Sequence, residues 1–348
     1  MRVLVTGALG NLGRVVSAEL RSRGHHVVTT DLRTKATEKA ARRQAGGTHL
    51  WADLTDADAV SRLLDDAAPD AVIHLAAIIP PVAYDNPRLA YRVNVEATRL
   101  LAEALAARPG GPRLVFASSM AVYGSRNPHT SSPPVTATTP PAPPEIYGAH
   151  KVECEELIAA SGVEWTVLRV GAVISSDQML SVTRDMIYLE GCLPTDGRVH
   201  LVDVRDVARA FAAAVDADCA GRTLLIGGDA SHRVTQDELS TRMTAAIGFP
   251  GVLPHGRPGD PARDDAWFSV EWMDTDEAQS LLDFQRISFE QTLREARAKV
   301  GPLRLLGPIG APLGRALLGR GAPYRGRDGA FADPWGVIGE RWGKDVLA

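Results

Sequence analysis

A glycine-rich turn near the start of the chain constrains its fold more than any other feature. The segment Thr6-Gly-Ala-Leu-Gly-Asn-Leu-Gly13 follows a short apolar run and precedes a segment of helical periodicity over 12–23. Gly7 permits the tight turn, Gly10 leaves room for phosphate against the backbone, and Gly13 lets the helix pack closely on the strand. Because phosphates then meet free N–H groups at a helix N-terminus, this order predicts a Rossmann-type site for a dinucleotide.

Strand-like apolar runs alternate with helical segments over the first half of the chain. Predicted strands after the first cover 25–30, 71–77, 114–119 and 165–170, and another ends at Asp53; predicted helices cover 12–23, 56–67, 88–107 and 145–160. A helix over 203–215 and a strand over 223–226 follow. This alternation predicts an α/β fold, a doubly wound parallel sheet with helices on both faces.

The later segments are less regular and suggest a division into regions. We expect a dinucleotide-binding domain over 1–170, to which 204–228 return. A smaller C-terminal α/β region for substrate is expected from 171–203 and 229–300. Residues 127–144 are crowded with Pro, Ser and Thr and are expected to form a long loop. The extension 301–348 is rich in Gly, Pro and Arg, with an apolar stretch over 309–318. It either packs on its own domain or contacts a membrane surface or partner.

Composition excludes several classes of function. The 348 residues carry a net charge of −4, so no bulk attraction to nucleic acid is expected. No apolar run approaches the roughly 18 residues that span a bilayer. The three cysteines, Cys154, Cys192 and Cys219, show no CxxC spacing. We therefore expect neither a disulfide framework nor a metal site, as is typical of a cytoplasmic protein.

The end of the second predicted strand indicates which dinucleotide binds. Asp31 lies 18 residues after Gly13, where a carboxylate accepts hydrogen bonds from the ribose hydroxyls and repels a 2′-phosphate. NAD is therefore favoured over NADP, and Arg33 is the residue that could soften this preference. Asp53, after the third strand, either contacts the adenine edge or caps the next helix.

A second group of residues carries chemistry. Tyr147 and Lys151 lie four residues apart in a predicted helix, so their side chains share one face. A phenol with a pKa of about 10 is a poor base at neutral pH. A nearby ammonium and the positive nicotinamide of an oxidised cofactor would stabilise the phenolate and lower that pKa. Ser119 ends the fifth strand, at the ligand-binding edge of the sheet, where its hydroxyl can bond a substrate oxygen.

Further segments, in the same order, complete a family pattern. They are Ala52-Asp-Leu54, His74-Leu-Ala-Ala77, Asn94-Val-Glu-Ala-Thr98, Phe116-Ala-Ser-Ser-Met-Ala-Val-Tyr-Gly124 and Tyr147-Gly-Ala-His-Lys151. From Met1 to about Lys299 the chain resembles the extended short-chain dehydrogenase/reductase family, the group of NAD-dependent epimerases and dehydratases. The motifs are specific for the family and not for any member.

The resemblance implies roles for matching residues. Tyr147 would be the acid/base, Lys151 its activator and ribose ligand, and Ser119 the partner of the substrate oxygen. The dinucleotide would be bound by Gly7, Gly10, Asn11, Leu12, Gly13, Asp31, Leu32, Arg33, Asp53, Leu54, Leu75, Ala76, Ala77, Asn94, Ser118, Tyr147, Lys151 and Val170. Helices around 90–106 and 146–160 would form a homodimer seam, as in relatives.

Departures from the family pattern concern the substrate. Nucleotide-sugar enzymes of this family often carry an asparagine shortly after the Leu-Arg pair of strand six. Here Leu168-Arg-Val-Gly-Ala172 contains no amide. They often place an arginine seven residues before the aspartate that is Asp206 here, but Val199 stands at that position, beside Arg198.

The sequence is compatible with three functions. The first is an NAD(P)-dependent oxidoreductase that moves hydride between nicotinamide and a secondary alcohol or ketone of a small metabolite. The second is a nucleotide-sugar epimerase or dehydratase with tightly bound NAD. Dehydratases use an acidic pair after the serine that is Ser119 here, but Met120 and Ala121 stand there. Of the two reactions, epimerisation is therefore favoured over dehydration. The third is a non-catalytic dinucleotide-sensing protein.

Overall fold

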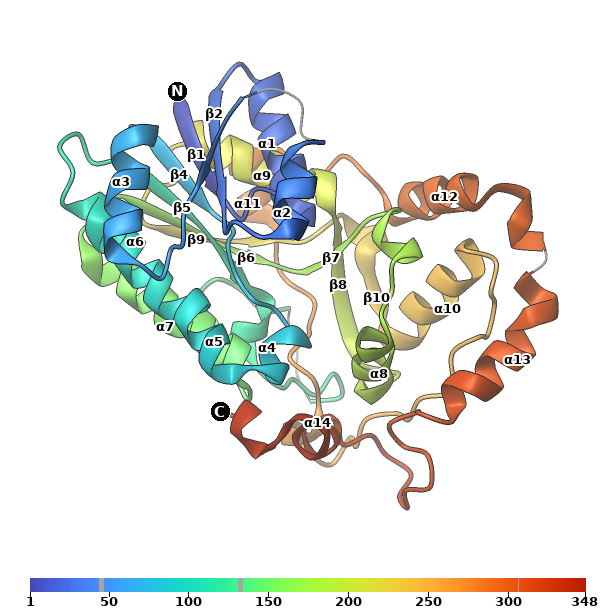
Figure 1. Ribbon diagram of the computed structural model, residues 1–348. Helices are drawn as coiled ribbons and strands as arrows, with labels where there is room; N and C mark the ends of the chain where they lie inside the picture. Colours follow the sequence, from blue (N-terminus) through green and yellow to red (C-terminus); the bar gives the residue numbers. More distant parts are fainter. Residues whose placement is uncertain (44–46, 131–133, 306) are drawn as a thin grey trace.

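The central layer of the protein is a seven-stranded parallel sheet, seen in a computed structural model that describes residues 1–43, 47–130, 134–305 and 307–348 (Figure 1). Its strand order is β3-β2-β1-β4-β5-β6-β9, and every neighbouring pair is parallel. The strands are β1 Arg2–Thr6, β2 His26–Asp31, β3 Thr48–Trp51, β4 Ala71–His74, β5 Arg113–Ser119, β6 Trp165–Val170 and β9 Arg222–Ile226. This confirms the predicted doubly wound α/β fold.

Helices cover both faces of this sheet. One face packs against α1 Asn11–Ser22, α9 Val204–Asp216 and α11 Asp276–Leu282, and the other against α3 Ala57–Ala67, α6 Ala97–Ala106 and α7 Ile146–Ser161. Alternate residues of β1 serve the two cores, since Val3 and Val5 join Phe211 on one side while Leu4 joins Leu64 on the other. Burial on both faces explains why these strands are continuously apolar.

A second, smaller sheet stands beside the first. It contains β7 Ala172–Ile174, β8 Arg198–Asp203 and β10 Arg233–Thr235, with β8 in the middle, parallel to β7 and antiparallel to β10. Its neighbours are α8 Arg184–Cys192, α10 Gln236–Ala246 and α12 Phe289–Val300 (Figure 1). Val199, Leu201, Leu239 and Phe289 form its core.

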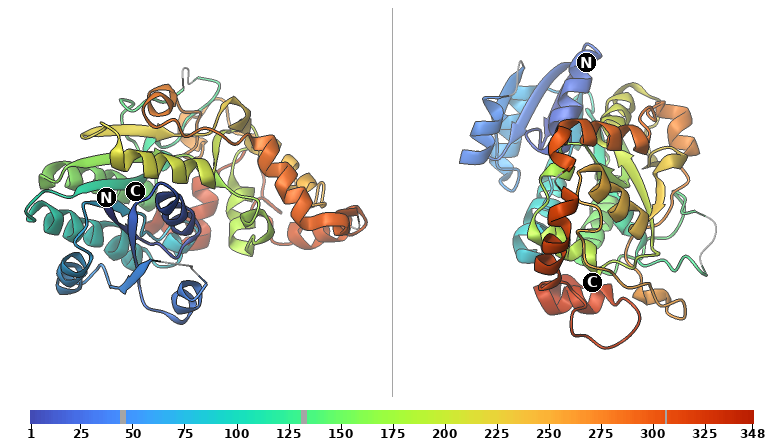
Figure 2. Two further views of the ribbon diagram at one scale, coloured as in Figure 1. Left: turned by 90° about the horizontal axis from the view of Figure 1, so that it is seen from above. Right: turned by 90° about the vertical axis from the view of Figure 1, so that its right-hand side faces the viewer.

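The C-terminal extension forms two helices, α13 Gly307–Gly319 and α14 Pro334–Trp342. From α14, Val337 and Ile338 are buried with Ala83 and Tyr84 of α4 (Val82–Asp85). The interpretation of an extension packed on its own domain therefore describes α14. Figure 1 shows α13 at the right-hand edge of the molecule, and it faces the viewer in the right panel of Figure 2.

Three element boundaries differ from the sequence prediction. β4 ends at His74 instead of residue 77, because the N–H groups of Leu75 and Ala76 turn to donate to the Thr6 hydroxyl, at 3.2 and 3.3 Å. β3 ends at Trp51, before Asp53. The helix predicted over 88–107 is α5 Pro87–Tyr91, a π-helical turn over Arg92–Glu96 and then α6.

The expected loop over 127–144 lacks regular structure in its described part, and residues 131–133 lie outside the described residues. No helix in the described ranges has the length and apolar character to cross a membrane. The cysteines Cys154, Cys192 and Cys219 are buried and free.

Candidate active site

A groove of about 810 Å³ crosses the carboxyl ends of the parallel strands. Most of the residues predicted from the sequence meet in its lining: Gly7, Gly10, Asn11, Leu12, Gly13, Asp31, Leu32, Asp53, Leu54, Leu75, Ala76, Ala77, Ser118, Ser119, Tyr147, Lys151 and Val170. Two predicted residues, Arg33 and Asn94, are not among those that line it. The chain thus brings the dinucleotide motif and the Tyr-Lys-Ser group into one space.

The glycine turn at the start of the groove has the shape that a pyrophosphate requires. Gly7 has a φ of +63°, which favours glycine, and a Cβ at Gly13 would stand 2.3 Å from the Gly7 carbonyl oxygen. Gly10 is the N-cap of α1 and offers no side-chain cap, and the first turn of α1 carries no acidic residue. The first N–H groups of α1 are therefore available to an anion.

Asp31 closes the adenosine end of the groove. Its carboxylate accepts hydrogen bonds from the N–H groups of Leu9 and Leu32, at 3.1 and 2.9 Å, and burial raises its pKa. Arg33 points elsewhere, in an ion pair of 2.9 Å with Glu38. This arrangement fits the ribose hydroxyls of NAD. Because Arg33 is paired with Glu38, its charge is not directed to a 2′-phosphate.

The side chains of Asp53 and Asn94 both bind backbone groups. Asp53 also lines the groove, whereas Asn94 is not among the residues that line it. Asp53 lines the groove and accepts from the Thr55 N–H at 3.0 Å, while the cap of α3 is Asp56. Asn94 is buried in the π-helical turn, where its side chain accepts from Ile78 N at 2.7 Å and donates to Ile78 O at 2.9 Å. Asn94 therefore shapes the loop beside the groove, from behind it.

The Tyr147, Ser119 and Lys151 side chains meet at the other end of the groove. Tyr147 and Ser119, which ends β5, both line the groove, and the Ser119 hydroxyl accepts from Ala121 N at 3.2 Å. The Lys151 ammonium donates to the Ala117 carbonyl at 2.7 Å and lies 5.7 Å from the centre of the Tyr147 ring. Ser118 turns its hydroxyl to Glu155, which pairs with Arg169 at 2.6 Å. The trio combines a phenol, a hydroxyl and a buried ammonium.

The electrostatics of this end are governed by burial. Desolvation raises the pKa of Tyr147, and the hydrogen bond with Ser119 opposes that rise. Desolvation also lowers the pKa of the Lys151 ammonium. The sequence predicts that Lys151 and the positive nicotinamide of an oxidised cofactor lower the pKa of Tyr147. In the protein alone, where the ammonium donates to the Ala117 carbonyl, burial dominates that pKa.

Glu145 is a positioning residue that the sequence analysis missed. Its side chain is 2% exposed and caps α7, accepting from the N–H groups of Tyr147 and Gly148 at 2.7 and 2.6 Å. The Tyr84 hydroxyl donates to the same carboxylate at 3.0 Å. An acidic residue directly before a helix was the signal in the sequence. Because Glu145 binds the Tyr147 backbone, it fixes the start of the helix that holds the acid/base.

The end of the groove beyond Tyr147 and Ser119 is mostly apolar. It is lined by Ile78, Ile79, Pro80, Val173, Gln178 and Met186, and the described residues that line the groove include no arginine. Arg198 is directed to other groups: it lies 3.5 Å from Glu271, stacks on Trp272 at 4.8 Å and donates to the Pro128 carbonyl.

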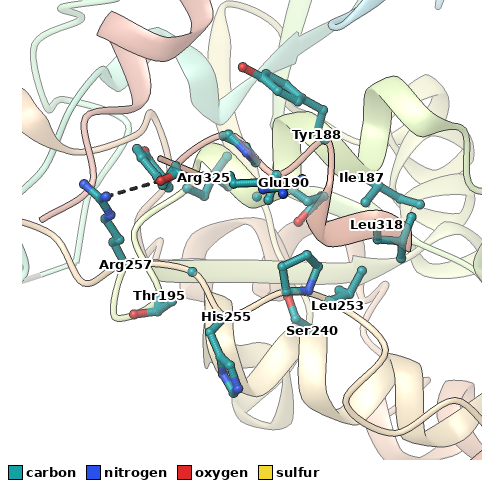
Figure 3. Close-up of a pocket in the computed structure, with 18 of the residues that line it drawn as sticks. Ile187, Tyr188, Glu190, Thr195, Ser240, Leu253, His255, Arg257, Leu318 and Arg325 are labelled. Carbon is teal, nitrogen blue, oxygen red and sulfur yellow. Dashed lines mark hydrogen bonds between the residues drawn. The ribbon is translucent and has the colours of Figure 1, made fainter. Parts of the chain in front are cut away.

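A second cavity, also of about 810 Å³, lies on the other side of α8 (Figure 3). Met186 faces the groove, whereas Ile187 and Tyr188 line this second cavity with parts of α10, the loop 253–257 and the extension. Its charged lining consists of Arg184, Arg257, Arg320, Arg325 and Arg341 with Glu190 and Asp237. We call it the arginine cavity. The sequence analysis missed it, because its arginines come from distant segments without a motif.

This groove and this trio on a doubly wound sheet define a short-chain dehydrogenase/reductase-type, NAD-dependent enzyme. Residues 3–227 match the model of the NAD-dependent epimerase/dehydratase family, which is more than half of the chain. The chain belongs to that family, as the sequence motifs predicted, and NAD is its cofactor.

Individual relatives cover the chain in part. Methionine adenosyltransferase 2 subunit beta of Pongo abelii is 33% identical over 170 residues, 49% of this chain and 46% of that protein. UDP-glucose 4-epimerase 4 of Oryza sativa subsp. japonica is 34% identical over 178 residues, 48% of this chain and 47% of that protein. The chain therefore spans about half the length of these curated relatives.

Solved structures match over a longer stretch. UDP-glucose 4-epimerase of Thermotoga maritima, solved with UDP-glucose, has a TM-score of 0.69 and 21% identity, covering 86% of this chain and 98% of that one. A short-chain dehydrogenase/reductase superfamily protein of Agrobacterium tumefaciens with bound NAD has a TM-score of 0.67 and 26% identity, covering 87% and 98%.

Proposed function

We propose that this protein catalyses hydride transfer between NAD and a secondary alcohol or ketone carbon of a small molecule, with Tyr147 as the acid/base. The observation that carries the proposal is that Tyr147, Ser119 and Lys151 line the same groove as the dinucleotide motif. A hydroxyl pair at that place can hold one oxygen atom of a substrate whose carbon faces the nicotinamide. Lys151, buried beside them, supplies the positive charge.

Each residue has a distinct part in this mechanism. NAD, when bound, accepts a hydride from the substrate carbon or returns it. Tyr147 takes the proton of the substrate hydroxyl in oxidation and gives it back in reduction. Ser119 holds the substrate oxygen. The Lys151 ammonium stabilises the phenolate and is placed to hold the nicotinamide ribose. Asp31 and the N-terminus of α1 would bind the adenosine ribose and the pyrophosphate.

The substrate would lie between the large sheet and the region formed by 171–203 and 229–300. The apolar residues at that end of the groove, Ile78, Ile79, Val173 and Met186, favour a small and fairly apolar substrate. Ile79 and Met186 are 57% and 41% exposed in the protein alone, so a bound substrate would cover them.

The arginine cavity and the relatives favour a second candidate, a nucleotide-sugar epimerase that keeps its NAD through each cycle. Five arginines outnumber the two carboxylates of the cavity lining, so its charge suits a diphosphate. A substrate that reached from Tyr147 past α8 would place its phosphates there. Two solved neighbours are UDP-sugar epimerases with NAD, by their descriptions.

One experiment separates these candidates. Purified protein is denatured and the released NAD is measured, and native protein is assayed with added NAD on secondary alcohols and on UDP-glucose. Empty protein that oxidises alcohols only with added NAD supports the oxidoreductase. Stoichiometric bound NAD with turnover of UDP-glucose supports the epimerase. If neither substrate class is turned over faster by the wild type than by Tyr147→Phe, the catalytic proposal is wrong and the dinucleotide-sensing alternative gains. The homodimer stays a prediction, which light scattering would check.

A further inference from the structure

Helix α13 exposes three large apolar side chains and buries two small residues. Ile309, Leu313 and Leu317 follow one face of the helix and are 81%, 67% and 52% exposed, and Leu305, just before it, is 70% exposed. We call these four residues the apolar stripe. Such a contiguous run of large exposed side chains on a folded protein marks a contact surface.

The opposite face of α13 is the one that packs on the protein. Gly307 and Ala311 are buried there, and a Cβ at Gly314 would stand 2.8 Å from a methyl group of Val252. Small residues let the helix approach the body closely and leave the leucines outside. This reverses the usual amphipathic order, in which large apolar residues face the core. The side chains of the apolar stripe therefore do not belong to the packed core of the protein.

The charge of this segment differs from that of the rest of the chain. Residues 301–327 contain no Asp or Glu, in a chain whose net charge is −4, and they carry five arginines: Arg304, Arg315, Arg320, Arg325 and Arg327. Two copies of this chain would bring two such basic surfaces together, which disfavours self-association through α13. An anionic surface with an apolar interior matches both the charge and the stripe.

We propose that α13 binds the surface of an anionic lipid bilayer. The apolar stripe would enter the boundary between headgroups and acyl chains, and Arg320, at the end of α13, would contact the lipid phosphates. Arg315 donates to the Gly251 carbonyl and Arg327 pairs with Glu340, so these two contribute charge and not direct contacts. The helix would lie in the plane of the membrane, without crossing it. This inference is independent of the proposed function, although Leu317, Leu318, Arg320 and Arg325 also line the arginine cavity, so docking would bring that cavity close to the bilayer.

The test is co-sedimentation of the full-length protein with vesicles. Wild type should bind vesicles of mixed phosphatidylglycerol and phosphatidylcholine and not those of phosphatidylcholine alone. Binding should be released at an ionic strength of about 1 M, where the screening length falls to ~3 Å. The double variant Ile309→Ser, Leu313→Ser should bind at least about tenfold more weakly. Val82→Ser is the matched control, because Val82 is 59% exposed on α4, far along the chain, and should bind as wild type does.

The outcomes decide between occupants. Equal binding to both vesicle types, no binding at all, or binding unchanged in the double variant would overturn the proposal. If wild type binds no vesicles and only the double variant loses a dimer in size-exclusion chromatography, the stripe joins two copies instead. Should the double variant fail to fold, as judged by its Tm, the salt dependence and lipid preference of wild type still decide.

Discussion

The dinucleotide groove and the arginine cavity enclose the same volume, about 810 Å³, but the chain builds them in opposite ways. The phosphate and catalytic end of the groove is made from the ends of parallel strands and the turns that follow them. The arginine cavity is made from side chains on α8, α10, a loop and the C-terminal extension, spread from Arg184 to Arg341. The shape of the dinucleotide groove is therefore set by the backbone, and that of the arginine cavity by the placement of side chains.

This difference teaches where specificity resides in such a protein. Backbone N–H groups at the start of α1 recognise phosphates that every dinucleotide shares. The substrate contacts depend on side chains that the backbone does not dictate, such as Met186 on one side of α8 and Tyr188 on the other. We therefore expect substitutions in the groove to abolish chemistry, and those in the arginine cavity to alter substrate affinity.

The largest effect is expected at Tyr147. Tyr147→Phe removes the proposed proton carrier, and kcat should fall by about 10²–10⁴-fold. Affinity for NAD should change little, because the phenol does not form the pyrophosphate site. Single-turnover rates and NAD titration measure the two quantities. Tyr123→Phe is the control, since the Tyr123 hydroxyl donates to the Thr136 carbonyl instead; an equal loss there would contradict the assignment.

The pH profile should report the same phenol. Burial raises the pKa of Tyr147, so the phenol is protonated at neutral pH and its phenolate fraction grows with pH. Alcohol oxidation needs phenolate and should speed up about tenfold per pH unit between about pH 7 and about pH 9. Ketone reduction needs the phenol and should stay level over that range. A flat oxidation profile at saturating substrate would show that another group takes the proton.

Asp31 should determine the choice of cofactor. Asp31→Ser removes a charged acceptor of the ribose hydroxyls, which typically contributes about 1.5–3 kcal/mol, so the Kd for NAD should rise by about 10–100-fold. The preference over NADP should fall as well, because the repulsion of a 2′-phosphate is lost. Asp53→Asn is the matched control at the same edge. If both variants lose NAD equally, Asp31 has no special role.

The groove could be predicted because its signals are local. A glycine turn, a carboxylate at a strand end and a Tyr-Lys pair on one helix each report neighbours in sequence. Asn94 departed from expectation because a π-helical turn within the predicted helix directs its side chain to Ile78. Glu145 had a local signal, as an acidic residue directly before a helix, but its bond with Tyr84, the arginine cavity and the packing of α14 depend on contacts between distant segments, in the case of Tyr84 and Glu145 61 residues apart. No periodicity or spacing in one sequence reports such contacts.

Variants of the arginine cavity would sharpen the contrast with the groove. Arg184 and Arg325 line the cavity, and their guanidinium groups have no hydrogen-bond or ion-pair partner within the described part of the chain. Arg184→Gln with Arg325→Gln should therefore leave the Tm unchanged. If the cavity holds a diphosphate, KM for UDP-glucose should rise about tenfold with kcat preserved. Arg222→Gln is the control, because Arg222 pairs with Glu277 and does not line the cavity. An unchanged KM would separate the cavity from the substrate site.

The smallest effect is expected where the extension meets the catalytic helix. The Ala348 N–H donates to the Pro144 carbonyl at 2.9 Å, Leu347 forms a backbone bridge with Glu145, and the Trp342 ring lies tilted against Tyr84 with 5.5 Å between ring centres. Ala348→Pro removes only the N–H donor, in a backbone where Leu347 is already extended, as a residue before proline prefers. The unfolding free energy should fall by about 1 kcal/mol, measured by urea denaturation.

Removing residues 344–348 should have a larger effect than Ala348→Pro, because it also removes the fully buried Val346. The loss in unfolding free energy should grow to about 2–3 kcal/mol. Because Glu145 caps α7 at Tyr147, kcat should fall by roughly two- to fivefold with NAD affinity intact, a split that general destabilisation alone does not produce. Equal kcat with and without residues 344–348 would mean that Glu145 holds α7 without help from the extension. The groove would then be independent of the region that forms the arginine cavity.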